Sequence, residues 1–302
     1  TEDGEKKEFK GFFNAAVFDA SIKEFFNKKE ELSDYFDDSV SEDIFDYIPN
    51  QETNQIFTPK WVVEMMVDKL EEENPGIFSD PSQTFADLYV KSGMYITEIV
   101  KRLNEGLKDE IPDRSKRLKH IFENQVYAIA PSNIIYNIAK NYIYGVTEDV
   151  STANLKELDL SPIVQEGDAQ DAIDNVFGRD KMKFDVVIGN PPYQDETIGD
   201  NATYAPPIYH EFMDEAYQLA PKVCMITPGR FLFNAGSTPK KWNKKMLEDN
   251  HLTVKYYETV SANIFPSTDI KGGVVVTYRD EEIDYGAMNI FTPHDKLNQI
   301  IK

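Results

Sequence analysis

The chain has 302 residues, of which 41% are hydrophobic and 28% charged, and its formal net charge is −21 at pH 7. This composition is typical of a globular protein with one large domain or two. A single cysteine, Cys224, excludes a disulfide framework, and no apolar run approaches the length of a membrane span. With no visible secretory leader, we expect a cytoplasmic protein with no membrane partner.

The first 50 residues are acidic, with 6 Lys/Arg against 14 Asp/Glu. Aromatic residues recur there at helical spacing, for example Phe9, Phe12 and Phe13. We therefore expect residues 1–55 to form a small acidic helical subdomain. The chain begins with Thr1 rather than Met, which indicates a fragment of a larger polypeptide.

From residue 57 on, helical and strand patterns alternate. In chain order they predict a helix at 60–70, a strand at 85–90, a helix at 95–103, a strand at 126–130 with a helix through 143, a strand at 184–189, a helix near 208–219, and strands at 223–227, 254–257 and 274–278. Such alternation predicts an α/β domain with a mostly parallel sheet covered on both faces. We assign it to residues 56–285, and 286–302 to the start of a truncated C-terminal region.

Two helix starts carry polar or glycine residues. Thr58 precedes Pro59 and is expected to cap the first helix. Lys91, Ser92 and Gly93 form a turn between strand and helix. Gly93 either lets the backbone approach a ligand, with the helix N-terminus favouring a carboxylate, or serves only as a helix-start turn.

The segment Asn190-Pro191-Pro192-Tyr193 directly follows the apolar strand 184–189. Two prolines cannot continue a strand ladder, so the chain leaves the sheet there. The Asn190 amide and the Pro191 carbonyl are then presented at the carboxyl end of the strand, where open α/β sheets bind ligands. The alternative is a proline-terminated strand followed by a surface tyrosine.

A pair of acceptors beside an aromatic ring suits a flat ring that bears an exocyclic amine. Accepting both N–H groups of adenine, through Asn190 Oδ1 and the Pro191 carbonyl, favours a pyramidal nitrogen and frees its lone pair. Tyr193 can stack on the base, which is worth about 1–3 kcal/mol in single-strand binders. A base in a duplex cannot reach such a pocket, so it must be flipped out. A sulfonium methyl donor would make an acid–base dyad or a metal unnecessary.

The order of these motifs resembles N6-adenine DNA methyltransferases of the gamma arrangement, from restriction–modification systems. The resemblance covers roughly residues 56–280 and implies a Rossmann-like S-adenosylmethionine-dependent methyltransferase fold. It implies that Asn190, Pro191, Pro192 and Tyr193 are catalytic and that Phe265 stacks on the flipped base. It further implies a set of donor-binding residues: Phe57, Thr58, Asp87, Ser92, Gly93 and Asp168. The residues by themselves leave Asp168 open as a turn residue and Phe265 as a core residue.

Two positions depart from the family pattern. Lys91 stands where the family has the first glycine of its donor-binding loop, and Ala130 stands where an acidic residue holds the donor ribose. A charged hydrogen bond is worth about 1.5–3 kcal/mol, so we expect weak binding of the donor.

The expected partner is double-stranded DNA, bound through a target recognition region absent from this chain, with possible nuclease or helicase modules. The strongly acidic charge argues against tight DNA binding by this piece alone. The basic cluster Lys240, Lys241, Lys244 and Lys245 is either a DNA-backbone contact or a solvated helix face. Two other functions stay open. One is a protein glutamine-N5 methyltransferase, since such enzymes share the four-residue motif; the other is a catalytically impaired DNA-positioning module.

Overall fold

The structure is a computed structural model that describes residues 23, 34–37, 57–147, 149–195, 205–266 and 268–293. By its contacts the chain divides into two units, 1–49 and 50–302. The helical subdomain predicted for residues 1–55 lies outside the described residues, apart from the five positions before residue 57.

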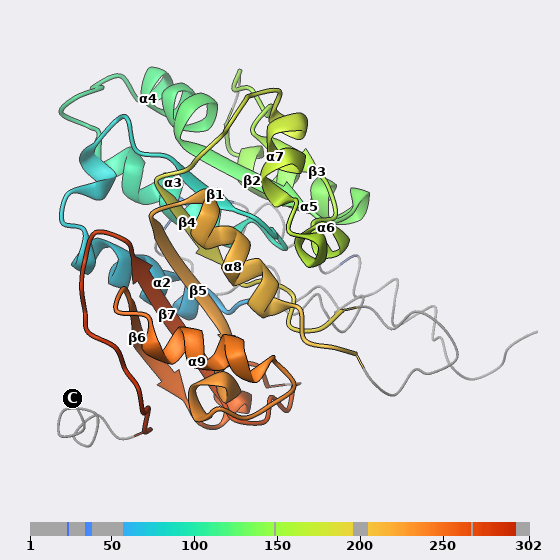
Figure 1. Cartoon of the computed structure of the whole chain (residues 1–302). Helices are drawn as coiled ribbons and strands as arrows, with labels where there is room; N and C mark the ends of the chain where they lie inside the picture. The colour runs from blue at the N-terminus through green and yellow to red at the C-terminus, as the bar shows by residue number, and fades with distance from the viewer. Residues whose placement is uncertain are drawn as a thin grey trace, which may run out of the picture. The chain divides into compact units, whose positions relative to one another are not determined.

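A seven-stranded sheet forms the centre of this unit, in the order β3-β2-β1-β4-β5-β7-β6 (Figure 1). Its strands are β1 (Phe85–Asp87), β2 (Val126–Ala130), β3 (Leu155–Glu157), β4 (Val186–Gly189), β5 (Lys222–Pro228), β6 (Leu252–Glu258) and β7 (Val274–Asp280). The first five run parallel, and β7 enters antiparallel between β5 and β6. The predicted α/β class with a mostly parallel sheet is confirmed. Because the chain reverses direction across the sheet at β1 and β4, ligands are expected at the carboxyl ends of these two strands.

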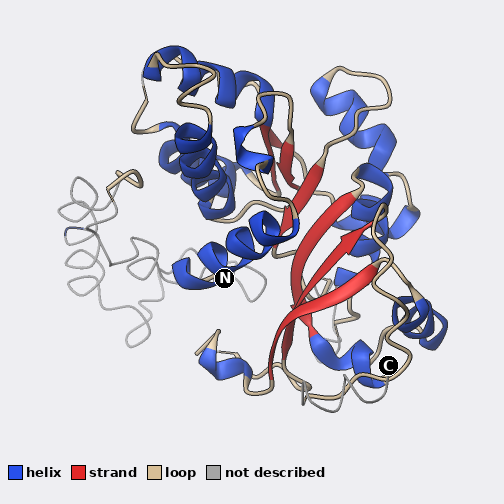
Figure 2. Ribbon diagram, turned by 90° about the vertical axis from the view of Figure 1, so that its left-hand side faces the viewer, coloured by secondary structure: helices blue, strands red, loops and turns tan. Residues whose placement is uncertain are grey.

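Helices cover both faces of the sheet (Figure 2). They are α2 (Lys60–Glu73), α3 (Met94–Gly106), α4 (Arg114–His120), α5 (Asn133–Tyr144), α6 (Ser161–Glu166), α7 (Ala169–Phe177), α8 (Tyr209–Leu219) and α9 (Lys240–Glu248). Short helical turns occur at η2 (Ile77–Ser79), η3 (Ile121–Gln125), η4 (Gly229–Phe233) and η5 (Ser261–Asn263). One layer is built from α2, α3 and α5, with α3 and α5 packing on β1, β2 and β3.

The other layer is built from α6 to α9, and alternate strand residues face it. Ala86, Tyr127 and Val187 belong to one buried cluster with Val164 of α6 and Phe212 of α8. Their strand neighbours, which are also buried, point to the opposite face. Burial on both faces explains why these strands are continuous apolar runs in the sequence.

The predicted elements differ from the observed ones in several places. β1 ends at Asp87 instead of residue 90, because residues 88 and 89 already form a turn. α3 begins at Met94 and continues to Gly106, past the predicted end at residue 103. β3 has only three residues and an intermediate-to-exposed outer half, so no apolar pattern marks it. The acidic segment before the Asn-Pro-Pro-Tyr strand folds into α6 and α7.

Cys224 and the residues just beyond β7 both pack within the sheet unit. Cys224 is buried in β5, where burial raises the pKa of its thiol to about 12. Beyond β7, Phe291 packs edge-on against Phe233 and Tyr257, so the chain after residue 286 still contacts the sheet unit. None of the helices in the described ranges is both long and apolar enough to cross a bilayer.

Both the backbone conformation and the packing at Gly93 require a residue without a side chain. Its φ is +94°, and a Cβ there would lie 2.7 Å from Cγ1 of Ile143 on α5. We expect Gly93→Ala to lower the free energy of unfolding through left-handed strain of about 1–3 kcal/mol and through overpacking of about 1–3 kcal/mol. Urea unfolding measures this loss.

Gly76 offers a matched control, because its φ is +86° and an added Cβ would meet nothing within 4 Å. Gly76→Ala therefore carries the strain without the clash, and we expect a clearly smaller loss. Equal losses for the two variants would show that Ile143 moves aside at no cost.

Candidate active site at the strand ends

Asp87 and Asn190 lie at the same edge of the sheet, at the ends of the neighbouring strands β1 and β4. The parallel register pairs Phe85 with Val186 and Ala86 with Val187. Gly189 is the last residue of β4, directly before Asn190, and a Cβ on Gly189 would lie 2.9 Å from Asp87 Oδ1. A glycine is needed at this position because the two strand ends come so close together.

The Asn190 side chain is buried, and its two polar atoms differ. Its Nδ2 donates a hydrogen bond of 3.0 Å to Thr58 Oγ1, which fixes the plane of the amide. Its Oδ1 is buried and has no hydrogen-bond partner among the described residues. A buried, unsatisfied acceptor costs about 1–3 kcal/mol, so it needs an explanation beyond stability. An acceptor oriented in this way is suited to an N–H group of a ligand.

Thr58 does not cap α2, and this prediction is wrong. The residue before α2 is Pro59, and no side chain caps the helix. The Thr58 hydroxyl is buried and instead contacts Asn190 and, at 3.5 Å, the Tyr95 hydroxyl. Tertiary contacts between segments 132 residues apart therefore decide the role of Thr58.

An ion-pair cluster joins the two helices that position Thr58 and Tyr95. Arg102 of α3 donates to Asp68 at 2.6 Å and to Glu71 at 3.1 Å, both on α2. It also contacts Glu98 on its own helix at 2.8 Å. These carboxylates raise the pKa of the half-exposed Arg102 despite its partial burial. The cluster holds α2 against α3, and so sets the start of α2 beside Asn190.

Asp87 and Lys91 are both buried, and burial shifts both pKa values. Burial raises the pKa of the Asp87 carboxyl to about 7, although the Tyr89 N–H at 3.0 Å and the charge of Lys91 act in the opposite direction. Burial also lowers the pKa of Lys91 to about 8, opposed by Asp87. Each group thus reduces the cost of burying the other, and both titrate near neutral pH.

A small cavity lies between these groups, with a volume of about 10 Å³, room for one water molecule. Its walls come from the starts of α2 and α3 and from the ends of β1 and β4. Five predicted site residues line it: Thr58, Asp87, Ser92, Gly93 and Asn190. Tyr89, Lys91, Met94 and Tyr95 complete the wall. The predicted residues therefore come together from three distant parts of the sequence.

Two predicted donor-binding residues do not line this cavity. Asp168 is exposed at the start of α7; burial raises the pKa of nearby Glu215 on α8, and the charges of Asp214 and Asp168 add to this. Phe57 is half-buried beside Thr58 and is not part of the cavity wall. At the tip of β2, Ala130 is buried and pairs in register with Glu157, an exposed carboxylate at the end of β3.

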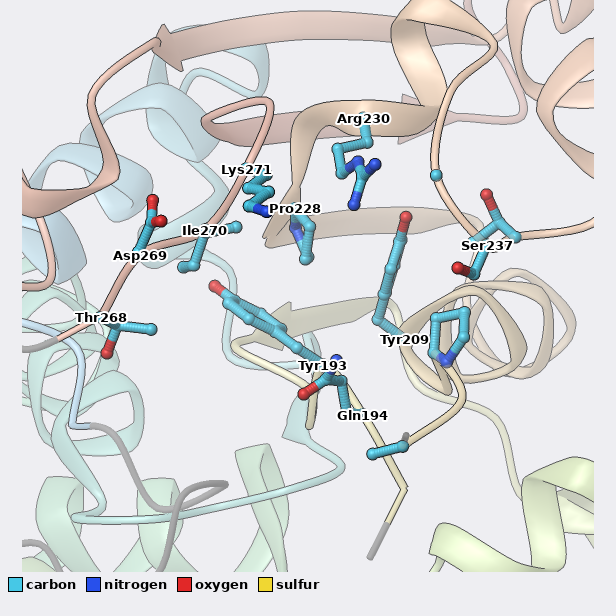
Figure 3. A pocket seen from close by; sticks show the side chains of 14 residues that line it. Tyr193, Gln194, Tyr209, Pro228, Arg230, Ser237, Thr268, Asp269, Ile270 and Lys271 are labelled. Carbon is cyan, nitrogen blue, oxygen red and sulfur yellow. The ribbon is translucent and has the colours of Figure 1, made fainter. Parts of the chain in front are cut away.

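Tyr193 faces a second and larger cleft, of about 310 Å³. Its ring lies in the wall of this cleft together with Tyr209, and its buried hydroxyl has no hydrogen-bond partner among the described residues (Figure 3). Phe265 is buried and meets the Tyr193 ring edge-on at 6.4 Å, and it is not part of the cleft wall. The Asn-Pro-Pro-Tyr segment therefore joins the two cavities, with Asn190 in the first and Tyr193 in the second.

Several residues of these cavities escaped the sequence reasoning. The sequence marks Lys91 as a departure from a family glycine but does not indicate its burial beside Asp87. Arg230 and Lys271 line the larger cleft. Their sequence signals are weak: Arg230 follows the strand-ending Pro228-Gly229, and Lys271 precedes a glycine pair. Across the part of the chain that the structure describes, no three His, Cys, Asp or Glu side chains are grouped to hold a metal ion.

Comparison with known proteins points in one direction. Residues 124–265 match the model of the Eco57I restriction-modification methylase family. A relative from Mycoplasma pneumoniae, described as an uncharacterized adenine-specific methylase, is 25% identical, and the match covers 77% of this chain and 68% of the relative.

Solved structures share the fold. The Type ISP restriction-modification enzyme LlaBIII, bound to DNA, matches 92% of this chain with a TM-score of 0.57 and 16% identity. A type I methyltransferase subunit from Streptococcus thermophilus matches 85% with a TM-score of 0.51 and 15% identity. This chain spans 21% of the length of the first and 55% of the second.

The comparisons favour the restriction–modification interpretation over the protein-glutamine and non-catalytic alternatives. The family match includes the end of β4 and the whole Asn-Pro-Pro-Tyr segment. The fold agrees with that of restriction–modification enzymes of two types. In its sequence from residue 124 to 265 and in its fold, the chain is therefore similar to restriction–modification methylases, and one of its relatives is described as adenine-specific.

Proposed function

We propose that this chain transfers a methyl group from S-adenosylmethionine to the N6 amine of adenine in DNA. The observation that carries the proposal is Asn190 Oδ1, a buried acceptor with no partner among the described residues. Thr58 holds the other amide atom, so the free oxygen keeps one direction. Such an acceptor fits an N–H group of the substrate and serves no purpose in the fold itself.

Asn190 prepares the amine by hydrogen bonding. The lone pair of an aromatic amine is delocalised into the ring, which makes the nitrogen a poor nucleophile. Accepting one N–H at Asn190 Oδ1 and the other at the Pro191 carbonyl favours the pyramidal nitrogen. Both acceptors sit on a proline-stiffened turn, so little reorganisation is needed when the amine arrives. Tyr193 supplies a ring face for the base.

The residues around Asp87 fit the amino-acid end of the donor. The Asp87 carboxylate suits an ammonium group, and the Ser92 hydroxyl with the start of the 13-residue helix α3 suits a carboxylate. When bound, S-adenosylmethionine would supply an electrophilic methyl group on its sulfonium. At the ribose end Ala130 offers no carboxylate, and Glu157 on the paired strand is in a position to replace it. Phe57 and Asp168 stay proposed donor contacts without support from the cavity wall.

The proposed substrate is an adenine extruded from duplex DNA, because a stacked base cannot reach a strand-end cavity. The larger cleft beside Tyr193 offers space for it, and Phe265 is proposed to support the Tyr193 ring against the base. The whole protein would locate its target sequence through regions outside the sheet unit, and would work with nuclease or helicase modules of the same system.

The direct test supplies the protein with methyl-labelled S-adenosylmethionine and unmodified host DNA. We expect label in DNA, recovered as N6-methyladenine after digestion, and modified adenines in host DNA only when the gene is present. Label recovered in protein as methylglutamine, with none in DNA, would overturn the proposal.

The pKa of Asp87 gives a pH dependence of donor binding. The folded-state pKa is raised from 3.8 to about 7, so the carboxyl is protonated and neutral below pH 7. If it holds the donor ammonium, the dissociation constant of the donor should rise about tenfold for each pH unit below 7. Calorimetry between pH 5.5 and about 7.5 measures this slope.

Asp87→Asn is the control for the pH dependence. The Asn oxygen can still accept from the Tyr89 N–H, so the turn after β1 keeps its hydrogen bond. This variant should bind the donor weakly and with a flat pH profile over the same range. A slope in the variant equal to that of the wild type would show that another group titrates.

A further inference from the structure

The larger cleft, beside Tyr193, carries two cationic side chains that the fold does not use. Arg230 follows β5 in η4, and Lys271 belongs to the loop before β7. Figure 3 shows the guanidinium of Arg230 and the ammonium of Lys271 on the same side of the cleft, across from the Tyr193 ring. The side chains thus come from three segments that are far apart in the sequence.

The stem of Arg230 is packed tightly between two glycines in the left-handed region. A Cβ on Gly272, whose φ is +85°, would overlap Cγ of Arg230 at 2.3 Å. A Cβ on Gly236, whose φ is +88°, would lie 3.3 Å from Cβ of Arg230. Both glycines therefore leave the space that the arginine stem fills, and the packing directs the guanidinium into the cleft beside Tyr209.

The guanidinium of Arg230 has no ion pair and no side-chain hydrogen bond with any described residue. Other arginines of the sheet unit are engaged by carboxylates, an amide, a phenol or main-chain oxygens; examples are Arg102, Arg117, Arg179 and Arg279. An Arg fixed by its stem but without a partner for its five N–H groups is prepared for an anionic ligand.

Lys271 is exposed, and within the described ranges it too has neither an ion pair nor a side-chain hydrogen bond. Asp269 also lines the cleft, so the cleft carries two positive charges and one negative charge. This local excess of positive charge occurs on a chain whose net charge is −21. Arg230 and Lys271 therefore give this cleft a local positive charge beside the Tyr193 ring.

We propose that Arg230 and Lys271 bind a backbone phosphate of the nucleotide whose base lies against Tyr193. The proposal rests on the proposed function, because it makes the cleft the site of the extruded nucleotide. Arg forms paired hydrogen bonds with phosphate oxygens, and phosphate contacts fix a nucleic acid in register without reading its sequence. The cleft thus holds a ring face for a base and cationic side chains for a phosphate, the two groups that one nucleotide presents.

The test asks whether the preference for a charged phosphate next to the adenine depends on Arg230 and Lys271. It is done without S-adenosylmethionine. The probe is a fluorescent single-stranded oligodeoxynucleotide with one adenine, and a second version has an uncharged methylphosphonate next to that adenine. At about 50 mM salt, we expect wild type to bind the charged probe about tenfold more tightly than the methylphosphonate probe. Arg230→Met, which keeps the stem, and Lys271→Met should bind both probes almost equally.

Lys108→Met is the matched control, since Lys108 is an exposed lysine just after α3 that pairs with Glu105. It should keep the tenfold preference. Lys271 is exposed, so Lys271→Met keeps the test decisive even if Arg230→Met does not fold. A preference that survives in both cleft variants would overturn the proposal, and so would no binding of the charged probe by wild type.

Three further outcomes separate this proposal from a free-phosphate site and from the proposed function. Displacement of the probe by millimolar inorganic phosphate, with no preference between the two probes, would indicate a free-phosphate site and would overturn the nucleotide site. A preference that depends on Arg230 in a protein that methylates no DNA would uphold the cleft assignment while the proposed function fails. Methylation of DNA by a protein whose probe preference depends on neither cation would uphold the proposed function and overturn the cleft assignment.

Discussion

Replacing Asn190 with alanine should reduce methyl transfer by at least about 10²–10³-fold, the cost of removing one preorganised hydrogen-bonding group from a reaction centre. The change removes the proposed acceptor of the substrate N–H and also the Nδ2 donor to Thr58 Oγ1. It should change the free energy of unfolding little, because losing the Thr58 bond costs stability while losing the unsatisfied buried Oδ1 removes a cost. Single-turnover methylation and urea unfolding on the same samples measure the two effects.

Asn154 provides the matched control. It is a buried asparagine just before β3, at the amino end of the sheet, and its Nδ2 donates to the carbonyls of Phe122 and Glu123. Asn154→Ala should therefore cost about 1–3 kcal/mol of stability and leave transfer per folded molecule unchanged. The assignment of Asn190 fails if the two variants lose activity in the same proportion as they lose stability.

Replacing Lys91 with glycine should tighten binding of S-adenosylmethionine by at least about tenfold, or roughly 1.4 kcal/mol. The gain in space sets the direction. The Lys91 side chain lines a cavity of about 10 Å³, far below the size of a small-molecule pocket, and its removal opens this cavity. The loss of the Lys91 charge acts the other way, because that charge lowers the pKa of Asp87, the carboxylate proposed for the donor ammonium.

Lys91→Met separates the two effects, because methionine keeps most of the volume and loses the charge. Tighter binding in both variants would assign the effect to charge, and tighter binding only in Lys91→Gly would assign it to space. Calorimetry with the donor or with S-adenosylhomocysteine gives the dissociation constants. Weaker binding in both variants would contradict the prediction and make Lys91 a ligand of the donor carboxylate.

The sequence by itself predicted most of the strands and the position of Asn190 at the end of β4. A short apolar run such as 184–189 that ends at two prolines favours a strand buried on both faces, so the position of Asn190 at a strand end followed from local rules. The same rules predicted β2 with its observed bounds and the mostly parallel sheet. β3 was missed because a three-residue edge strand with a half-exposed pattern carries no periodic signal.

Only the tertiary structure decided which residues meet at the site. Local rules assigned Thr58 to a helix cap, whereas packing across 132 residues makes its hydroxyl the partner of Asn190. The burial of Lys91 beside Asp87, the exposed position of Asp168 and the clamping of Arg230 between Gly236 and Gly272 are likewise invisible in the sequence. The physical reason is that burial and charge pairing depend on segments far apart along the chain, while capping and strand ending depend on neighbours.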